Sequence, residues 1–251
     1  MKPTVSALII AKDEQEDLAR CLMSLAETAA ADEVVVLVDA ASADKTEELA
    51  RRSGAKVARR AFDDYARQRQ AALELCTKEW VLWIDADERV DGALGGAIAT
   101  ATAAGGADAF PIRFSVEFMG KTLRFGGLGS EKHVRLFRRA KAKFVGGALH
   151  EGLEIDGEVG APLAGRMVHR PYKDLSEYVA KLDRYTSLAA QKKRDAGMKF
   201  TPLYHLVLPW ELLKRIVLKA AFLDGAPGLV WAGLSAFHHW LKYAKLKELE
   251  R

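Results

Sequence analysis

The first ninety residues alternate between short apolar runs and stretches with helical periodicity. Nearly every position of each run is apolar, which is typical of a strand that is covered on both faces of a sheet. The pattern therefore predicts strands at residues 5–10, 34–38, 57–58 and 80–84.

The stretches between these runs predict helices. Apolar side chains recur at the spacing of one helix face in residues 18–25, and further helices are expected at residues 46–52 and 62–76. Acids three residues apart stand at the start of the first two helices and have the spacing of a capping box: Asp13 with Glu16, and Asp44 with Glu47. The order β-α-β-α-β-α-β predicts right-handed crossovers and a doubly wound, mostly parallel α/β sheet.

Beyond residue 90 the periodicity is looser, and the chain ends in helices. The expected elements are a helix at residues 92–106, strands at 109–118 and 132–137, a mobile glycine-rich loop at 120–130, and helices at 175–194 and 203–247 with a break near 225–228. We therefore expect one domain over residues 1–170 and a helical extension over residues 171–251.

The composition is that of a globular protein. The 251 residues are 49% hydrophobic, and 38 Lys and Arg stand against 34 Asp and Glu, a net charge of +4. These values exclude disordered, collagen-like and disulfide-rich chains. A charge of +4 is too small to indicate nucleic acid by itself. The bases do cluster, because residues 111–147 contain nine Lys and Arg and two Glu, a local net charge of +7.

The cysteines and the apolar runs bear on the location of the protein. Cys21 and Cys76 lack the spacing of metal ligands, and the apolar start of the chain gives way to charge at Lys12. No run approaches the roughly 20 apolar residues of a membrane span. We therefore expect a cytoplasmic protein.

Acidic residues follow three of the predicted strands. In an open parallel sheet, ligands bind beyond the carboxyl ends of the strands, where Asp13, Asp39 and the segment 85–88 (DADE) are expected. Helix capping explains Asp13 equally well. The three acids of segment 85–88, however, would repel one another unless a cation or hydrogen-bond donors offset their charge.

The acids of segment 85–88 favour a hard metal ion. Oxygen ligands without clustered Cys or His suit Mg²⁺ or Mn²⁺, which commonly complete their shell with phosphate oxygens. The chain has neither a Rossmann fingerprint nor a Walker P-loop with which backbone amides could hold phosphates. A substrate that contains a diphosphate is therefore expected.

Four blocks of the first half resemble family 2 glycosyltransferases of the GT-A fold. They are residues 9–14 (IIAKDE), 32–39 (DEVVVLVD) with 42–46 (SADKT), 68–72 (QRQAA) and 79–88 (EWVLWIDADE). The closest resemblance is to the bacterial subgroup that adds glucose or a related sugar to the inner core of lipopolysaccharide. It extends to His150, Glu151, His169, Tyr172, Tyr178, Lys181, residues 222–225 (FLDG) and Gly228. This chain departs from the subgroup at three places. The subgroup usually has Asn in place of Asp13 and of Gln70, and a glycine or a small polar pair in place of Ala40 and Ala41.

The resemblance implies an inverting, metal-dependent sugar transfer, with UDP-glucose as the expected donor and a lipopolysaccharide-core-type saccharide as the acceptor. The residues expected to contact the nucleotide sugar are Lys12, Asp13, Asp39, Arg69 and Asp85. Asp39 would bind the base, Asp13 the base or ribose, and Asp85 the ribose. Asp87 would hold the metal between the two phosphates, and His169 could add a metal or diphosphate contact.

Catalysis and acceptor binding require further residues. An inverting transfer needs a carboxylate that accepts the proton of the acceptor hydroxyl. Glu151 is the candidate, with His150 orienting it or contacting phosphate, and an exposed loop acid is the other interpretation. A phosphorylated acceptor would suit the basic segment, which otherwise forms a solvated face. The candidates for acceptor binding are Arg124, Lys132, Arg135, Arg138 and His150.

The C-terminal stretch interleaves Trp and aliphatic residues with Lys and Arg. This mixture suits either a helix at a membrane interface or packing within a helical subdomain or a dimer, so a contact with the inner face of the cytoplasmic membrane stays open. The alternative functions are transfer of another sugar, transfer to a polyprenyl phosphate, a non-catalytic nucleic-acid or nucleotide-binding module, and a membrane-bound scaffold. We expect no nucleic-acid partner, because acids at the strand ends repel a polyanion.

Overall fold

The computed structural model describes residues 4–129, 131–147 and 150–250, and it describes no side chain at residues 147, 150 and 151. The chain divides into two compact units. The sheet unit combines Met1–Phe114 with Glu131–His169, and the helical unit combines Ser115–Ser130 with Arg170–Arg251. Residues 115–130 therefore group with the C-terminal helices, although they interrupt the sequence of the sheet unit.

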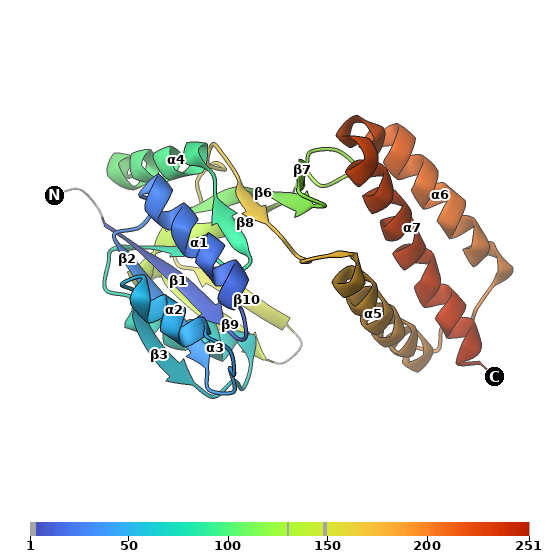
Figure 1. Ribbon diagram of the computed structural model, residues 1–251, viewed down its shortest axis with the longest axis horizontal. Helices are drawn as coiled ribbons and strands as arrows, with labels where there is room; N and C mark the ends of the chain where they lie inside the picture. Colours follow the sequence, from blue (N-terminus) through green and yellow to red (C-terminus); the bar gives the residue numbers. More distant parts are fainter. Residues whose placement is uncertain (1–3, 130, 148–149, 251) are drawn as a thin grey trace. The chain divides into compact units, whose positions relative to one another are not determined.

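The main sheet of the described residues has the strand order β3-β2-β1-β4-β8-β6-β11-β5 (Figure 1). Its parallel part consists of β1 (Val5–Ala11), β2 (Glu33–Asp39), β3 (Lys56–Arg60) and β4 (Trp80–Trp83). The other strands are β5 (Glu88–Val90), β6 (Ala109–Phe118), β8 (Lys132–Arg138) and β11 (Met167–His169). Because β8 runs antiparallel to both β4 and β6, the sheet is mixed.

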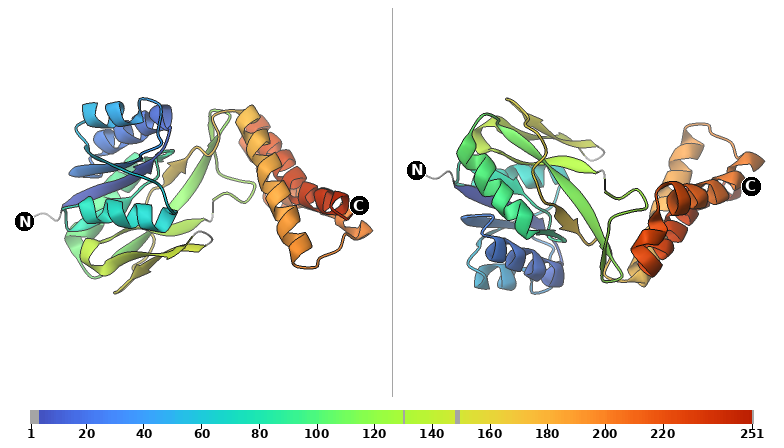
Figure 2. Two further views of the ribbon diagram at one scale, coloured as in Figure 1. Left: turned by 90° about the horizontal axis from the view of Figure 1, so that it is seen from below. Right: turned by 90° about the horizontal axis from the view of Figure 1, so that it is seen from above.

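Helices cover both faces of the parallel strands (Figures 1 and 2). The helices of this unit are α1 (Gln15–Thr28), α2 (Thr46–Arg52), α3 (Tyr65–Leu75) and α4 (Gly92–Ala104). Along β1, Ala7 and Ile9 pack with α1 and α4, whereas Leu8 packs with α3 on the opposite face. Burial on both faces explains why the strands are apolar at nearly every position, and the doubly wound α/β fold is confirmed.

Shorter elements complete the sheet unit and its connection to the helical unit. They are the 3₁₀ turn η1 (Arg139–Lys141), the antiparallel pair β9 (Ala142–Gly147) and β10 (His150–Ile155), and β7 (Lys121–Leu123), which pairs with the end of β6.

The two predicted capping boxes are wrong. Glu14 and Lys45 occupy the N-cap positions of α1 and α2, and neither side chain accepts a capping hydrogen bond. Asp13 and Asp44 instead bond across the loops that follow β1 and β2. The spacing of a capping box is local, whereas these bonds join residues about thirty positions apart, which a local pattern does not reveal.

The helical unit is built around its longest helix. Its helices are α5 (Leu175–Asp195), the 3₁₀ turn η2 (Pro202–Leu206), α6 (Val207–Leu213), the π turn η3 (Lys214–Leu218), the 3₁₀ turn η4 (Ala221–Asp224) and α7 (Gly225–Glu248). Both α5 and α6 pack against α7 (Figure 1). The core of this unit includes Phe118, Leu123, Tyr178, Leu182 and Trp231. None of the helices in the described part of the chain is long and apolar enough to cross a membrane.

The predicted break near residues 225–228 lies a few residues earlier in the structure. The chain turns through η4, and Gly225 and Gly228 form the first turn of α7. Gly225 has a left-handed φ of +69°, and a Cβ atom on Gly228 would lie 2.2 Å from the carbonyl oxygen of Ala221. These glycines therefore permit a close approach of two backbone segments at the start of the helix.

Candidate active site

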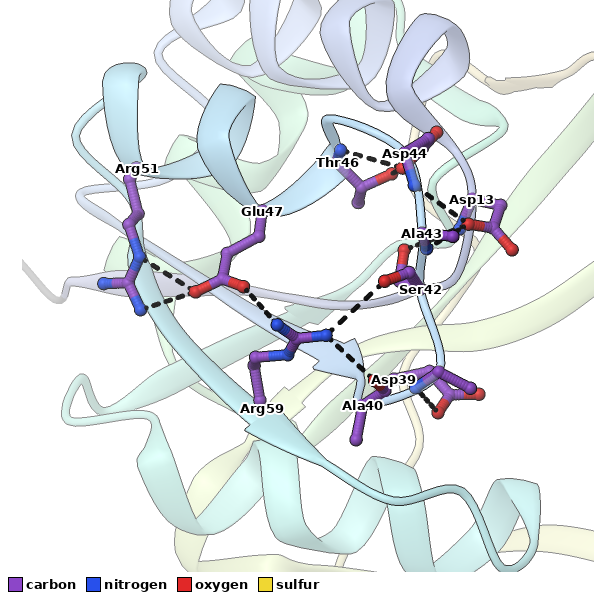
Figure 3. Close-up of polar contacts among 11 residues, drawn as sticks. Asp13, Asp39, Ala40, Ser42, Ala43, Asp44, Thr46, Glu47, Arg51 and Arg59 are labelled. Atoms are coloured by element: carbon purple, nitrogen blue, oxygen red, sulfur yellow. Dashed lines mark hydrogen bonds and ion pairs between the residues drawn. The ribbon is translucent and has the colours of Figure 1, made fainter.

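The loops that follow β1 and β2 are bonded to each other at the carboxyl edge of the sheet (Figure 3). Asp13 has a left-handed φ of 53°, and its Oδ1 atom accepts hydrogen bonds from the backbone N–H of Ala43 at 2.7 Å and of Asp44 at 3.3 Å. In return, the Asp44 carboxylate accepts the backbone N–H of Gln15 at 3.0 Å. Asp13 thus fixes the shape of the loop in which the nucleotide was expected to bind.

Arg59 supports the same loop from β3 (Figure 3). Its Nη2 atom donates to the carbonyl oxygens of Ala40 at 2.8 Å and Ser42 at 3.4 Å, while its Nη1 atom lies 3.2 Å from Glu47 of α2. Sequence analysis did not single out Arg59. It follows the predicted strand at residues 57–58 by one position, which gave no indication that it reaches backbone carbonyls of a neighbouring loop.

Asp39 ends β2 and is buried. Its Oδ1 atom accepts the backbone N–H of Ala41 at 2.9 Å, and its Oδ2 atom lies 3.6 Å from Nζ of Lys12. The hydrogen bond from Ala41, together with the charge of Lys12, lowers the pKa of Asp39. Asp39 is therefore a fixed, charged acceptor at the end of its strand.

Asp85 lies just beyond β4 and is held by three donors. Trp83 donates Nε1–H to Oδ1 at 3.1 Å, Arg69 donates to the same oxygen at 3.3 Å, and Arg135 donates to Oδ2 at 3.1 Å. Burial alone would raise the pKa of Asp85, but the guanidinium groups of Arg135 and Arg69 hold it well below its usual range. Asp85 therefore stays ionised.

The two arginines also contact the ring of Trp83. The guanidinium carbons of Arg69 and Arg135 lie 4.5 Å and 3.9 Å from the ring centroid. Arg135 further donates to Glu88 at 2.9 Å, and the second Glu88 oxygen accepts the backbone N–H of Asp85 at 2.8 Å. Burial raises the pKa of Glu88 and the charge of Asp85 adds to this, although Arg135 opposes both effects. Hydrogen-bond donors therefore offset much of the repulsion that the sequence predicted within segment 85–88.

Asp87 is turned toward a different partner, His169. The strands β5 and β11 pair antiparallel with His169 opposite Glu88, and the Nε2 atom of His169 lies 3.0 Å from Oδ2 of Asp87. Both side chains keep about one third of their surface exposed, 31% for Asp87 and 35% for His169. Burial alone would lower the pKa of His169, but the hydrogen bond and charge of Asp87 raise it.

The Asp87–His169 pair can supply two ligands to a divalent cation. No group of three or more His, Cys, Asp or Glu side chains suited to a metal occurs within the described residues. The Asp87 carboxylate and the His169 ring lie within hydrogen-bond distance of each other, and both are ligand types that Mg²⁺ or Mn²⁺ accepts. One carboxylate and one imidazole therefore fit an ion whose remaining ligands come from phosphate and water.

The structure places the remaining predicted site residues elsewhere. Lys132 is exposed at the start of β8, whereas Arg138 at the other end pairs with Glu79 and lies 3.3 Å from Asp108. Arg124 belongs to the helical unit. His150 and Glu151 begin β10, but their side chains lie outside the described residues.

Trp83 was not predicted as a site residue, and Glu88 was predicted only as one of the three acids of segment 85–88, without a role of its own. Trp83 precedes Asp85 by two positions, and alternation along an extended strand directs such side chains to the same face. That signal could have revealed Trp83. Glu88 pairs with Arg135 because β8 runs antiparallel beside β4, and local periodicity does not indicate which strands pair.

The sheet unit is a doubly wound α/β fold with acids gathered at the carboxyl ends of β1, β2 and β4. Residues 6–126 match the family model described as glycosyl transferase family 2. An uncharacterized glycosyltransferase of Rickettsia typhi is 30% identical over 98% of this chain and 87% of its own length. The lipopolysaccharide core biosynthesis glycosyltransferase LpsC of Rhizobium meliloti is 29% identical over 97% of this chain and 94% of its own length. The chain therefore belongs to glycosyltransferase family 2 and is an enzyme of that family.

A solved structure shares the fold. The crystal structure of S. aureus TarS 1–349 superimposes with a TM-score of 0.50 at 14% identity, covering 99% of this chain and 91% of TarS 1–349. At this level of identity the likeness concerns the fold alone, and it agrees with the arrangement of a sheet followed by C-terminal helices.

Proposed function

We propose that the chain is an inverting, metal-dependent glycosyltransferase that moves glucose from UDP-glucose to a lipopolysaccharide-core-type saccharide. The observation that carries the proposal is the partly exposed Asp87–His169 pair, which directly follows Asp85 and the buried Arg69 and Arg135 that hold it. The name of the relative LpsC supports the choice of acceptor.

The residues at the strand ends bind and orient the donor in this proposal. Asp39 and Lys12 provide an acceptor and a cation beside the loop that Asp13 holds, where they face the base. Asp85 binds the ribose, and Arg69 lies beside the nucleotide. Because Arg135 and Arg69 fix Asp85 on two sides, its carboxylate is already oriented before the donor arrives.

Asp87 and His169 would hold a divalent cation, Mg²⁺ or Mn²⁺. When bound, this cation acts as a Lewis acid that offsets the negative charge of the departing diphosphate. His169 must be neutral to act as a ligand, so binding of a metal by His169 would compete with protonation of its ring at low pH, and Asp87 favours the protonated form.

Glu151 acts as the general base of the transfer. The acceptor oxygen bonds to the anomeric carbon as the bond from that carbon to the UDP oxygen breaks, and Glu151 accepts the hydroxyl proton. Attack from the face opposite UDP inverts the configuration. His150 orients Glu151, and Lys132 supplies charge for a phosphorylated acceptor, a role that the sequence also predicted for Arg124. Arg135 acts through Asp85 and Glu88, to which it is bonded, whereas Arg138 pairs with Glu79 beside the first residue of β4, at the other end of that strand from Asp85.

A thermal-shift panel of UDP-, GDP- and ADP-sugars tests the donor assignment. A ligand that binds only the folded state raises the melting temperature, so UDP-glucose with Mn²⁺ should give the largest shift and EDTA should abolish it. A larger shift with a GDP- or ADP-sugar would overturn the UDP assignment. Glu151→Gln should keep the UDP-glucose shift but lose transfer, and loss of both would remove Glu151 as the base.

A further inference from the structure

The outer side of α6 and its flanking turns carries a row of exposed apolar side chains. We define this apolar row as Leu203, Leu206, Trp210, Leu213 and Val217, whose exposed fractions range from 51% to 72%. Their spacing of three, four, three and four residues places them along one side of a helix. Glu211 and Leu212 lie on the other side, where α6 packs against α7. The row is therefore not part of the core of the helical unit.

The turn η4, which follows η3, also exposes apolar side chains. Phe222 and Leu223 of η4 are 53% and 55% exposed, whereas the next residue, Asp224, is buried. The Oδ2 atom of Asp224 accepts the backbone N–H groups of Arg124 and Phe125 at 2.9 Å and 2.8 Å. Asp224 thus anchors the turn to the loop after β7, and the two apolar side chains before it stay outside.

The acids within residues 196–247 are buried, whereas Glu250, which is exposed, accepts the backbone N–H of Phe200 at 2.6 Å. Between residues 196 and 247 the sequence has seven Lys and Arg and two acids, Glu211 and Asp224, and both acids are buried. Glu211 is neutralised within the unit by Lys214 at 3.2 Å and Arg215 at 3.4 Å. The solvent-facing part of this stretch therefore combines apolar side chains with cationic ones.

The helical unit as a whole is also positively charged. It contains 17 Lys and Arg against 9 Asp and Glu, a net charge of +8, whereas the whole chain has +4. The sheet unit accordingly has −4. An apolar helix face can insert into the interface of a bilayer, and the positive charge around it is attracted to anionic lipid headgroups.

We propose that the apolar row is a docking surface for an anionic lipid membrane, with α6 lying in the plane of the interface. A second copy of this chain fits the row less well, because a symmetric contact brings the same patch of both copies together. Lys214 and Lys219 of the two copies would then face one another, and residues 196–247 offer no exposed acid to pair with them. The inference does not depend on the identity of the sugar donor.

Co-sedimentation with phosphatidylcholine vesicles, with and without phosphatidylglycerol, tests the proposal. The parent protein should bind vesicles that contain phosphatidylglycerol at low salt and be released at high salt. The double variant Trp210→Ser/Leu213→Ser should reduce binding about tenfold, because two interfacial side chains are lost. Leu188→Ser is the matched control, since Leu188 is 61% exposed on α5 and should not contribute.

Tryptophan emission and light scattering test the same proposal in two further ways. Tryptophan emission of the parent should shift to the blue on phosphatidylglycerol vesicles as Trp210 enters the interface, and this needs no variant. Unchanged emission would contradict insertion of the row. Vesicle binding by the double variant equal to that of the parent would overturn the proposal. So would a parent dimer in light scattering that the double variant abolishes, because the row would then bind a second copy.

Discussion

The Nη2 atom of Arg135 donates to the Oδ2 atom of Asp85 over 3.1 Å. The same nitrogen donates to Glu88, so one guanidinium group serves two carboxylates beyond β4. Asp87, which lies between these two acids in the sequence, instead contacts His169. Asp85 and Glu88 therefore hold the site in shape, whereas Asp87 is the acid that could bind a cation.

Replacing Arg135 should destabilise the fold strongly. Arg135→Ala leaves Asp85 and the buried Glu88 without their shared partner, and we expect a loss of about 3–5 kcal/mol in the free energy of unfolding. Urea denaturation measures this loss. Arg51→Ala, which removes an exposed ion pair with Glu47, is the control and should cost about 1 kcal/mol or less. Equal effects of the two substitutions would refute the role of Arg135.

Asp13 should tolerate Asn but not Ala. The side chain accepts loop N–H groups through Oδ1 while its backbone is left-handed, and Asn retains both an acceptor oxygen and tolerance of that conformation. Asp13→Ala loses both and should lower the free energy of unfolding by about 1–2 kcal/mol. Thermal denaturation of the two variants compares them. This also explains why the chain can have Asp where related sequences are expected to have Asn.

Asp224 should stabilise the helical unit through the backbone it anchors. Asp224→Ala leaves the N–H groups of Arg124 and Phe125 without their acceptor, at an expected cost of about 1–3 kcal/mol. The control is Asp195→Ala, because Asp195 is exposed at the end of α5. Hydrogen exchange at Arg124 and Phe125 gives a local readout, and unchanged protection in Asp224→Ala would contradict the anchoring role.

Glu33 should contribute to the loss of stability in acid. Burial would raise its pKa, but hydrogen bonds from Ser6 and Thr77 lower it below the ordinary value of 4.5. Because the folded-state pKa is depressed, the contribution of Glu33 is present above about pH 4.5 and is lost as the pH falls through the folded value. Glu33→Gln should therefore flatten the decline of unfolding free energy below pH 5. A decline as steep as that of the parent would exclude Glu33 as a cause.

The strands and helices that depend on local periodicity were predictable from the sequence. The helix at 46–52 has the predicted bounds, and the three acids of segment 85–88 do follow a buried strand. Their partners were not predictable, because Arg69 and Arg135 reach Asp85 from sixteen and fifty residues away in the sequence. Periodicity describes one element at a time and contains no information about which elements pair.

The same limit applies to the unit boundaries and the glycine-rich loop. Residues 115–130 group with the C-terminal helices through contacts such as Arg124 with Asp224, one hundred positions apart. The loop that glycine content predicted to be mobile is bonded to η4 through the N–H groups of Arg124 and Phe125, and Gly126 N–H donates to the carbonyl of Lys219, between η3 and η4, at 2.8 Å. Glycine content indicates conformational freedom, but it does not show what the loop binds.

The proposed transfer reaction is tested most directly by Asp87→Asn in an assay with UDP-glucose and a lipopolysaccharide-core acceptor. We expect the parent to transfer glucose with Mn²⁺ and not with EDTA, and Asp87→Asn to lose at least about a hundredfold in rate while keeping the parent's melting temperature without ligand. Asn keeps an acceptor oxygen for His169, so the fold should persist. Full activity of Asp87→Asn, or transfer that is indifferent to EDTA, would contradict the account.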